Sequence, residues 1–121
     1  MHYITLKKRA DFVRVSKARN TARSTHIWVQ CFIDKSKNNE EIRVGYTASR
    51  KTGNAVARNR GKRRMRALAR LVLPSILAEF PKFSGDFVLI AIPDTVTCNY
   101  TVLANDFKNA VRRCLLRFIA C

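Results

Sequence analysis

The segment from Ser49 to Arg70, SRKTGNAVARNRGKRRMRALAR, constrains the fold more than any other part of this 121-residue chain. It contains nine lysines and arginines and no acidic residue, yet apolar residues recur through it at regular intervals. On a helix that turns by about 100° per residue, one side is apolar and carries Met65, Leu68, Ala69 and Val72. The other side carries Asn59, Lys62, Arg63, Arg66 and Arg70. A disordered basic tail has no reason to sort its residues in this way, so a helix that docks by its apolar side is predicted.

Glycine, asparagine and proline mark the limits of this helix. The helical period begins after Gly53 and Asn54 and continues until Pro74, which is predicted to stop it. Gly61 falls beside the apolar side, where its missing side chain allows a close approach to a sheet. The same glycine costs the helix about 1 kcal/mol relative to alanine.

Two segments before this helix have the composition of strands. The run from Thr25 to Asp34 is rich in β-branched and aromatic residues. Alternation places Ile27, Val29, Cys31 and Ile33 on one face and His26, Trp28, Gln30 and Phe32 on the other. The run from Glu41 to Ser49 is a second strand, with Ile42, Val44 and Tyr46 on one face. The polar stretch KSKNNE between them suits a turn, so the two strands are predicted to form an antiparallel hairpin.

Three more segments complete the predicted fold. Leu6 to Ser16 suits a helix with Leu6, Ala10 and Val13 as its core stripe, which leaves Phe12 and Val15 on the opposite side. The continuous apolar run from Asp86 to Ile92 suits a strand buried on both faces. Ala104 to Phe118 suits a closing helix with Phe107, Val111, Cys114, Leu115 and Phe118 inward and Lys108, Arg112, Arg113 and Arg117 outward. The order α-β-β-α-β-α predicts a single α+β domain over residues 1–121, with three helices on a small sheet of about four strands.

The charge of the chain indicates a polyanionic partner. Twenty-four lysines and arginines against eight acids give a net charge of +16, far more than solubility requires. Such self-repulsion destabilises a compact state unless a partner compensates it. Nucleic acid is the first candidate, and an anionic membrane surface is the second.

The remaining composition points to the cytoplasm and away from catalysis by the chain. Cys31, Cys98, Cys114 and Cys121 form no C-x-x-C pair and no zinc-site spacing, so reduced thiols are expected. The N-terminus lacks the apolar stretch of a signal peptide, and no apolar run reaches the roughly 20 residues of a membrane span. His2 and His26 have no nucleophile or carboxylate cluster nearby in the sequence, so no catalytic residue is predicted.

The basic segment resembles the signature of the bacterial ribonuclease P protein subunit. The hallmark R-N-R, then K-R and a further arginine, corresponds to Arg58, Asn59, Arg60, Lys62, Arg63 and Arg66. The lead before it corresponds to Ser49, Arg50, Lys51, Gly53, Asn54, Ala55 and Val56. The resemblance extends to LKKRADFVRV, RVGYTASRK and GDFVLIAIP, and so covers nearly the whole chain.

The resemblance implies a non-catalytic subunit of an endoribonuclease. In this family a large RNA carries the catalytic site and, with Mg²⁺, removes the 5′ leader from precursor tRNA. The protein binds that RNA, about one protein per RNA, and grips the leader. No cofactor is then expected on the protein alone, Mg²⁺ is required by the holoenzyme, and neither DNA nor a membrane is a partner. The implied fold is ribosomal protein S5 domain 2-like, with a left-handed βαβ crossover that carries the R-N-R helix.

The family's leader-binding cleft lies between the first helix and the sheet. With the basic segment, the resemblance implies that RNA is bound by Phe12, Arg14, Val15, Trp28, Gln30, Phe32, Ser49, Arg50, Lys51, Asn54, Arg58, Asn59, Arg60, Lys62, Arg63, Arg66 and Arg70. Family members often carry a second aromatic residue where this chain has Ser16, and a strand aromatic where it has Gln30. Trp28 and Phe32 share that strand face and are expected to substitute as stacking partners.

Three other classes compete with this interpretation. A ribosomal or other rRNA-binding protein is the nearest alternative, because it too is small, basic and often of split α+β fold. A DNA-binding module is disfavoured, since the chain has no helix-turn-helix spacing or zinc pattern. A membrane-surface helix is disfavoured because the apolar side of the basic helix lacks large aromatic residues.

Overall fold

The computed structural model describes residues 3–37 and 39–120, so His2 and Cys121 lie outside it. The described strands are β1 (Ile4–Thr5), β2 (Thr21–Arg23), β3 (Trp28–Ile33), β4 (Ile42–Ala48) and β5 (Gly85–Ala91). The described helices are α1 (Arg9–Lys17), α2 (Ala55–Leu71), α3 (Leu73–Leu77), α4 (Pro93–Thr97) and α5 (Tyr100–Ala120), and a 3₁₀ turn, η1 (Arg50–Thr52), precedes α2. The α+β class is confirmed, with more short elements than the sequence pattern indicated.

The sheet has the strand order β1-β4-β5-β3-β2. The predicted hairpin is therefore wrong: β5 lies between β3 and β4, antiparallel to the first and parallel to the second. The physical reason is the continuous apolar sequence of β5, which is buried at every position except the half-buried Ile90. Such a strand needs neighbours on both edges and cover on both faces, which only a central position supplies.

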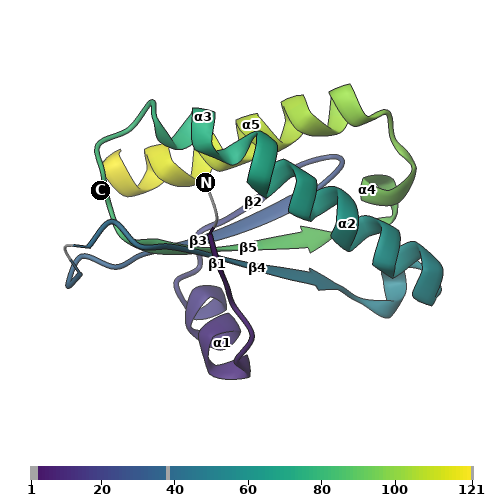
Figure 1. Cartoon of the computed structure of the whole chain (residues 1–121), viewed down its shortest axis with the longest axis horizontal. Helices are drawn as coiled ribbons and strands as arrows, with labels where there is room; N and C mark the ends of the chain where they lie inside the picture. Colours follow the sequence, from purple (N-terminus) through teal and green to yellow (C-terminus); the bar gives the residue numbers. More distant parts are fainter. Residues whose placement is uncertain (1–2, 38, 121) are drawn as a thin grey trace.

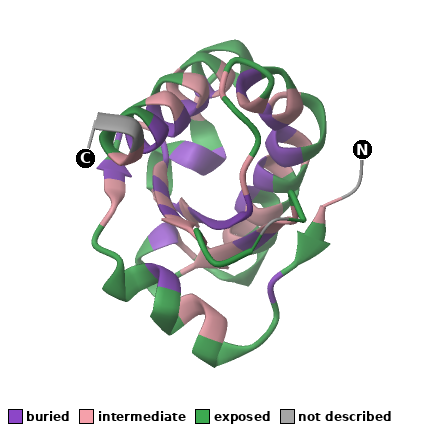
Figure 2. Cartoon of the chain, turned by 90° about the vertical axis from the view of Figure 1, so that its left-hand side faces the viewer, coloured by how far each residue is buried: buried purple, intermediate pink, exposed green. Residues whose placement is uncertain are grey.

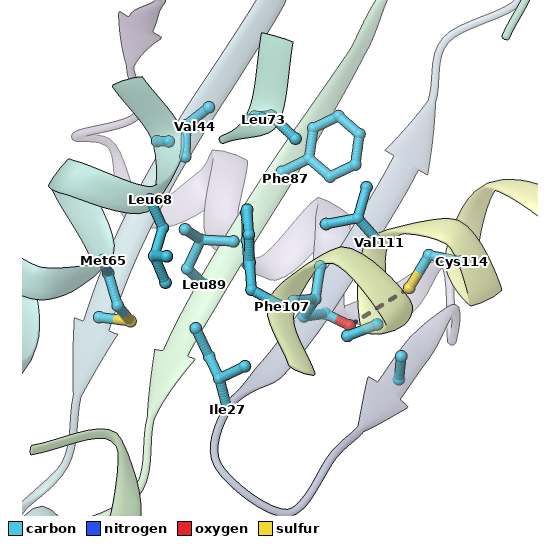
Figure 3. Close-up of a cluster of buried hydrophobic side chains, with 14 of the residues drawn as sticks. Ile27, Val44, Met65, Leu68, Leu73, Phe87, Leu89, Phe107, Val111 and Cys114 are labelled. Atoms are coloured by element: carbon cyan, nitrogen blue, oxygen red, sulfur yellow. Dashed lines mark hydrogen bonds between the residues drawn. The ribbon is translucent and has the colours of Figure 1, made fainter. Parts of the chain in front are cut away.

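Helices cover the two faces of the sheet unequally (Figure 1). On one face lie α2, α3, α4 and α5, and on the other lies α1 alone. The main core fills the first layer, where Ile27, just before β3, packs with Leu89 of β5, Met65 and Leu68 of α2 and Phe107 of α5 (Figure 3). Buried residues accordingly line the sheet-facing sides of these helices, whereas most of α1 is exposed (Figure 2).

The docked basic helix is confirmed as α2. Met65 and Leu68 are fully buried, and the side chain of Asn54 caps the helix by accepting a hydrogen bond of 2.9 Å from the backbone N–H of Ala57. Gly61 is also buried, and a Cβ there would lie 3.2 Å from Cβ of Ala91 on β5. The missing side chain of this glycine thus eases the close approach between helix and sheet.

The connection between the parallel strands β4 and β5 runs through α2 and α3. The predicted stop at Pro74 is misplaced, because α2 ends at Leu71 and Pro74 lies in the first turn of α3. Proline is compatible with that position, where its missing N–H would have no partner within the helix. The left hand of the crossover stays a prediction.

The orientation predicted for the first helix is wrong. Val15, predicted to face away from the core, is fully buried, whereas Val13 is 38% exposed. Leu6 precedes the helix, which begins at Arg9, so it is not in phase with the residues that follow. Leu6, Val15 and Val88 instead form a second, small core between α1 and the sheet, and Phe12 packs against it.

The closing helix is longer than predicted but its faces are correct. It begins at Tyr100, and Phe107, Val111, Cys114 and Leu115 are buried against the sheet while Phe118 is half-buried. Four further residues were predicted to point outward. Arg113 and Arg117 are exposed, and Lys108 and Arg112 are half-buried.

Candidate nucleic-acid interface

The register of the strands arranges the side chains on the α1 face of the sheet in three rows. The first row is Arg43, Asp86 and Phe32 on β4, β5 and β3. The second row is Gly45, Val88, Gln30 and Thr21, and the third is Thr47, Ile90, Trp28 and Arg23, each running from β4 across to β2. The first row crosses three strands, and the second and third rows cross four.

Helix α1 covers the first two rows. Phe12 lies directly over Gly45, where an added Cβ would be 2.7 Å from the aromatic ring. Val15 packs on Val88 in the small core, and the guanidinium of Arg14 lies 5.6 Å from the ring centroid of Phe32. The glycine on β4 therefore leaves the space that the Phe12 ring occupies.

The third row, Thr47, Ile90, Trp28 and Arg23, remains partly exposed along the side of α1, and we call it the open strip. Its aromatic member is covered on one side by a cation, because Arg23 lies 4.9 Å from the ring centroid of Trp28. At the β4 end the strip leads directly to Ser49 and η1. A partly exposed aromatic ring among cations is the arrangement on which single-stranded nucleic acids stack.

A buried carboxylate fixes α1 to the sheet. The side chain of Asp86 is 6% exposed and accepts hydrogen bonds of 2.8 Å from Nε and Nη2 of Arg43 and from Nη2 of Arg14. Asp11, on α1, lies 3.1 Å from Arg14 and 3.7 Å from Arg43. The side-chain hydrogen bonds to Asp86 raise the pKa of Arg43, so this guanidinium stays charged at all relevant pH values. The cluster ties β4, β5 and α1 together beside the open strip.

The cationic side of α2 faces outward from the opposite layer. Asn59, Arg60, Arg63, Arg66 and Arg70 are exposed, and Arg58 and Lys62 are half-buried. Arg66 lies 5.6 Å from the ring centroid of Tyr46, and Arg58 donates a long hydrogen bond of 3.4 Å to the carbonyl of Gly53. Burial raises the pKa of Tyr46, with Arg66 acting in the opposite direction. These contacts leave most guanidinium donors of α2 free for a ligand.

One arginine of the basic segment serves the fold instead. Arg64 donates hydrogen bonds of 2.8, 3.2 and 2.7 Å to the carbonyls of Thr95, Val96 and Cys98. It thereby satisfies carbonyls in and just after the short helix α4. The helical wheel indicated no special role for this residue, because α4 itself was not predicted.

A second cationic feature lies at the edge strand β2, beside the C-terminal end of α1 and the neighbouring part of α5. A hollow of about 510 Å³ is lined there by Ser16, Arg19, Thr21, Arg23, Gln30, Arg113 and Arg117, and we call it the edge pocket. The sequence pattern missed Arg19, Arg23, Arg113 and Arg117 as site candidates. Nothing in their spacing showed that they converge, since β2, which brings the three segments together, was too short to recognise.

The predicted site residues form two sets on opposite layers of the sheet. Phe12, Arg14, Trp28, Gln30 and Phe32 lie on the α1 face, and the α2 residues lie on the other. The exposed residues Ser49, Arg50, Lys51 and Asn54 stand between the two sets at the end of β4. Val15 belongs to neither surface, because it is entirely buried beneath α1.

The cysteines show no sign of a metal or redox site within residues 3–37 and 39–120. Cys31, Cys98 and Cys114 are unpaired there, and no group of three potential metal ligands converges. Burial raises the pKa of the Cys114 thiol to about 11 and that of Cys31 well above its usual value. Both thiols therefore stay protonated and behave as small apolar side chains.

His26 is an anchor for the loop between β2 and β3. A carboxylate oxygen of Asp106 on α5 accepts a hydrogen bond of 2.8 Å from the backbone N–H of His26 and lies 3.2 Å from its Nδ1. Asp106 thus holds this loop against α5.

No helix in the described part of the chain is long and apolar enough to cross a lipid bilayer.

An α+β domain with a partly open sheet face, a partly exposed aromatic ring and uncompensated cations is typical of proteins that bind single-stranded nucleic acid. Comparison with known proteins defines the family. The Ribonuclease P family model matches residues 2–115, and this chain belongs to that family.

Relatives and solved structures agree with this assignment. The ribonuclease P protein component of Ruegeria pomeroyi is 42% identical over 109 residues, covering 89% of this chain and 83% of its own. That of Gluconacetobacter diazotrophicus is 32% identical over 112 residues, covering 93% and 91%. The ribonuclease P protein of Thermotoga maritima has a similar fold, with a TM-score of 0.70 at 22% identity over 90% of this chain and 96% of its own.

Proposed function

We propose that this chain is the RNA-binding, non-catalytic protein subunit of ribonuclease P, in which an RNA subunit cleaves the 5′ leader from precursor tRNA. The observation that carries the proposal is the open strip, a partly exposed row beside α1 that holds an aromatic ring and continues into the basic residues at the start of α2. The relatives named as ribonuclease P protein components support the assignment. Mg²⁺ is required by the holoenzyme, and the protein alone binds no cofactor.

The leader is the proposed ligand of the open strip. Before cleavage it is single-stranded, so its bases are free to stack on aromatic rings while cations hold its backbone. Trp28 and the exposed part of Phe12 supply aromatic surface there, and Arg23 supplies charge. Neither DNA nor a membrane has a role in this proposal.

The catalytic RNA is the proposed ligand of the cationic side of α2, with one protein bound per RNA. Arg63, Arg66 and Arg70 follow one another along the exposed side of α2, without a carboxylate of any described residue within 4.0 Å. Guanidinium forks in such a row suit the phosphates of a structured RNA. The residues from Ser49 to Asn54 lie between the two surfaces, where the leader would pass from the catalytic RNA into the strip.

Reconstitution with the cognate RNA tests this proposal. The protein alone should not cleave precursor tRNA, and it should raise cleavage by the RNA at low Mg²⁺ concentration, where RNA–RNA repulsion is poorly screened. Robust cleavage without RNA would overturn the proposal. If the protein instead captured ribosomal RNA from a lysate and had no effect on the cleavage reaction, an rRNA-binding function would replace it.

A substitution on α1 tests the leader contact separately. Phe12→Ala should weaken binding of leader-carrying precursor to the holoenzyme by about 1 to 3 kcal/mol, the usual contribution of a base-aromatic stack, and leave mature tRNA unaffected. The matched control is Val13→Ala, which shortens the neighbouring exposed side chain. Since Phe12 also packs on the small core, a thermal melt must accompany the titration. Equal losses for precursor and mature tRNA would remove Phe12 from the leader site.

A further inference from the structure

An apolar hollow of about 420 Å³ lies at the end of the sheet where β4 begins, and we call it the end pocket. Its apolar wall is formed by Tyr3, Ile42, Leu77, Phe80 and Phe83. All five side chains also pack against the main core, in the layer that holds α2, α3, α4 and α5. The end pocket therefore lies on the opposite side of the sheet from α1 and the open strip.

The chain that leaves α2 leads directly to the end pocket. Ile42 is paired with Gly85, so the crossover that starts at the end of β4 must return to this point before β5 begins. Helix α3 lies on this return path, directly after α2 (Figure 1). Pro74 of α3 lines the pocket and lies four residues beyond Arg70 of α2. At a rise of about 1.5 Å per residue, this separation is roughly one helical turn, or about 6 Å.

The charges around the end pocket are compensated, unlike those along α2. Glu40 and Lys82 both line the hollow, and their Oε2 and Nζ atoms lie 3.6 Å apart. Their side chains are 55% and 79% exposed, so this pair remains in contact with water. A phosphate gains little from a lysine that already has a carboxylate beside it. The pocket thus favours an uncharged group.

One polar group of the pocket wall has no partner. The hydroxyl of Tyr3 is buried and makes no hydrogen bond with any described residue. Burial also raises the pKa of Tyr3, so the phenol stays protonated and is able to donate as well as to accept. A buried hydroxyl without a partner destabilises the structure that contains it. A ligand with a hydrogen-bonding edge would relieve this cost, whereas an aliphatic side chain would not.

An unpaired nucleobase has the properties that the pocket favours. Its faces are flat and stack on aromatic side chains, and its edges carry donors and acceptors. Phe80 and Phe83 supply half-buried aromatic surface, and Tyr3 supplies the hydroxyl. The phosphates on either side of such a base need cations close by, which the exposed side chains of Arg66 and Arg70 provide on α2.

We propose that the end pocket receives one unpaired base of the catalytic RNA, while α2 holds the phosphates beside it. This inference rests on the proposed function, since it takes the catalytic RNA as the ligand of α2. The precursor's leader has no part in it, because the leader's proposed site is on the other face of the sheet. The end pocket adds recognition of a base to a surface whose other proposed contacts are with phosphates.

The test uses complexes of the catalytic RNA with three protein variants, in the absence of precursor tRNA. Ala78→Phe fills the pocket, since Ala78 is exposed and lines it. Tyr3→Phe removes only the unpaired hydroxyl, so it keeps the test informative if the larger change disturbs the fold. The matched control is Thr101→Phe, which adds the same ring at an exposed position of α5 outside both pockets. Thermal melts of all variants establish whether the fold is retained.

The variant Ala78→Phe should bind the catalytic RNA roughly tenfold more weakly, as expected for the loss of one stacked base. The slope of log K against log salt should stay that of the wild type, because no phosphate contact is lost. Tyr3→Phe should weaken binding about two- to tenfold, the usual contribution of one hydrogen bond, again at an unchanged slope. Thr101→Phe should match the wild type in both quantities.

Chemical probing of the RNA identifies the base. Dimethyl sulfate modifies unpaired adenine and cytosine, and a carbodiimide modifies unpaired uracil and guanine. One unpaired base should be protected in complexes with the wild type and with Thr101→Phe, and should react in the complex with Ala78→Phe. Replacing that nucleotide by an abasic one should weaken wild-type binding roughly tenfold and leave binding by Ala78→Phe unchanged.

Several results would overturn the proposal. One is wild-type affinity of both Ala78→Phe and Tyr3→Phe, and another is an equal loss for Ala78→Phe and Thr101→Phe. The absence of any base whose protection depends on Ala78 would also refute it, as would a shallower salt slope for Ala78→Phe, because that slope reports lost phosphate contacts.

A second copy of this chain is the rival occupant of the end pocket. Sedimentation velocity of the free protein tests it, and a wild-type dimer that Ala78→Phe converts into a monomer would replace the base by a second copy. The proposed function fails in a different way, namely if the wild-type protein does not bind the catalytic RNA or does not raise its cleavage of precursor tRNA.

Discussion

Removal of the Asp86 carboxylate is the perturbation that most directly tests how α1 is held. Asp86 accepts three hydrogen bonds of 2.8 Å from Arg43 and Arg14, and its side chain is 6% exposed. Asp86→Ala leaves Arg43, itself only 19% exposed, without its main partner. Breaking a buried ion pair by removing one partner costs about 3 to 5 kcal/mol, against a total stability of about 5 to 15 kcal/mol for a domain.

Equilibrium unfolding in urea measures this loss, because urea is uncharged and does not screen the ion pairs. The midpoint should fall at an unchanged m-value. Glu79→Ala is the matched control: it breaks a bidentate pair with Arg112 whose side chains are 45% and 37% exposed, and should change the midpoint little. Replacing both partners, as in Arg43→Met/Asp86→Leu, should recover much of the loss. A loss below about 1 kcal/mol for Asp86→Ala, or equal losses for the two carboxylates, would refute a buried, structural pair.

Three further predictions concern α2, the sheet and the thiols. Leu68→Ala should lower the free energy of unfolding by about 2 to 5 kcal/mol through transfer and cavity terms, whereas Arg66→Ala should weaken RNA binding and leave the melting temperature nearly unchanged. Gly45→Ala places a methyl group 2.7 Å from the Phe12 ring, so it should displace this ring and weaken binding of leader-carrying precursor more than binding of mature tRNA, as measured by titration with both. With a pKa of about 11 for Cys114, only about one thiol in a thousand is ionised at pH 8. Iodoacetamide at that pH should therefore leave Cys31 and Cys114 unmodified until the protein is unfolded, as read by mass spectrometry, and rapid labelling of the native protein would contradict their burial.

Long periodic segments could be predicted from the sequence, because the regular spacing of their apolar side chains identifies which face of the helix or strand is buried. The apolar side of α2, the double burial of β5 and the inward residues of α5 were all predicted correctly. The pairing of strands could not be, because a polar loop between two strands is compatible with a hairpin or with the insertion of a third strand. The apolar run of β5 carried the missing information, since a strand buried on both faces belongs in the centre of a sheet.

Short elements escaped prediction for a different reason. The strands β1 and β2 have two and three residues, too few for a period to appear, and α4 has five. The orientation of α1 failed because the stripe was counted from Leu6, which lies outside the helix. Each residue of phase error turns the helical wheel by about 100°, and Val15, two residues from Val13, was therefore assigned to the wrong side.

Composition alone also could not separate the cations that bind a ligand from those that hold the fold. The pairing of the acidic residues distinguishes the two groups, because a cation bound by a carboxylate serves the fold. Asp11, Glu40, Glu41, Glu79, Asp86 and Asp106 each pair with a cation or a histidine within this chain, and Asp34 binds the hydroxyl of Ser36. Asp94 lies in the first turn of α4, where the helix dipole favours an acidic side chain. All eight acids of the sequence thus serve local structure.

The net charge of +16 is therefore concentrated in residues such as those of the edge pocket and of α2, which are held by neutral partners or exposed to solvent. An RNA that covers both surfaces should raise the melting temperature of the wild type far more than that of a variant whose edge pocket and α2 cations are neutralised together, because only the wild type carries this uncompensated repulsion.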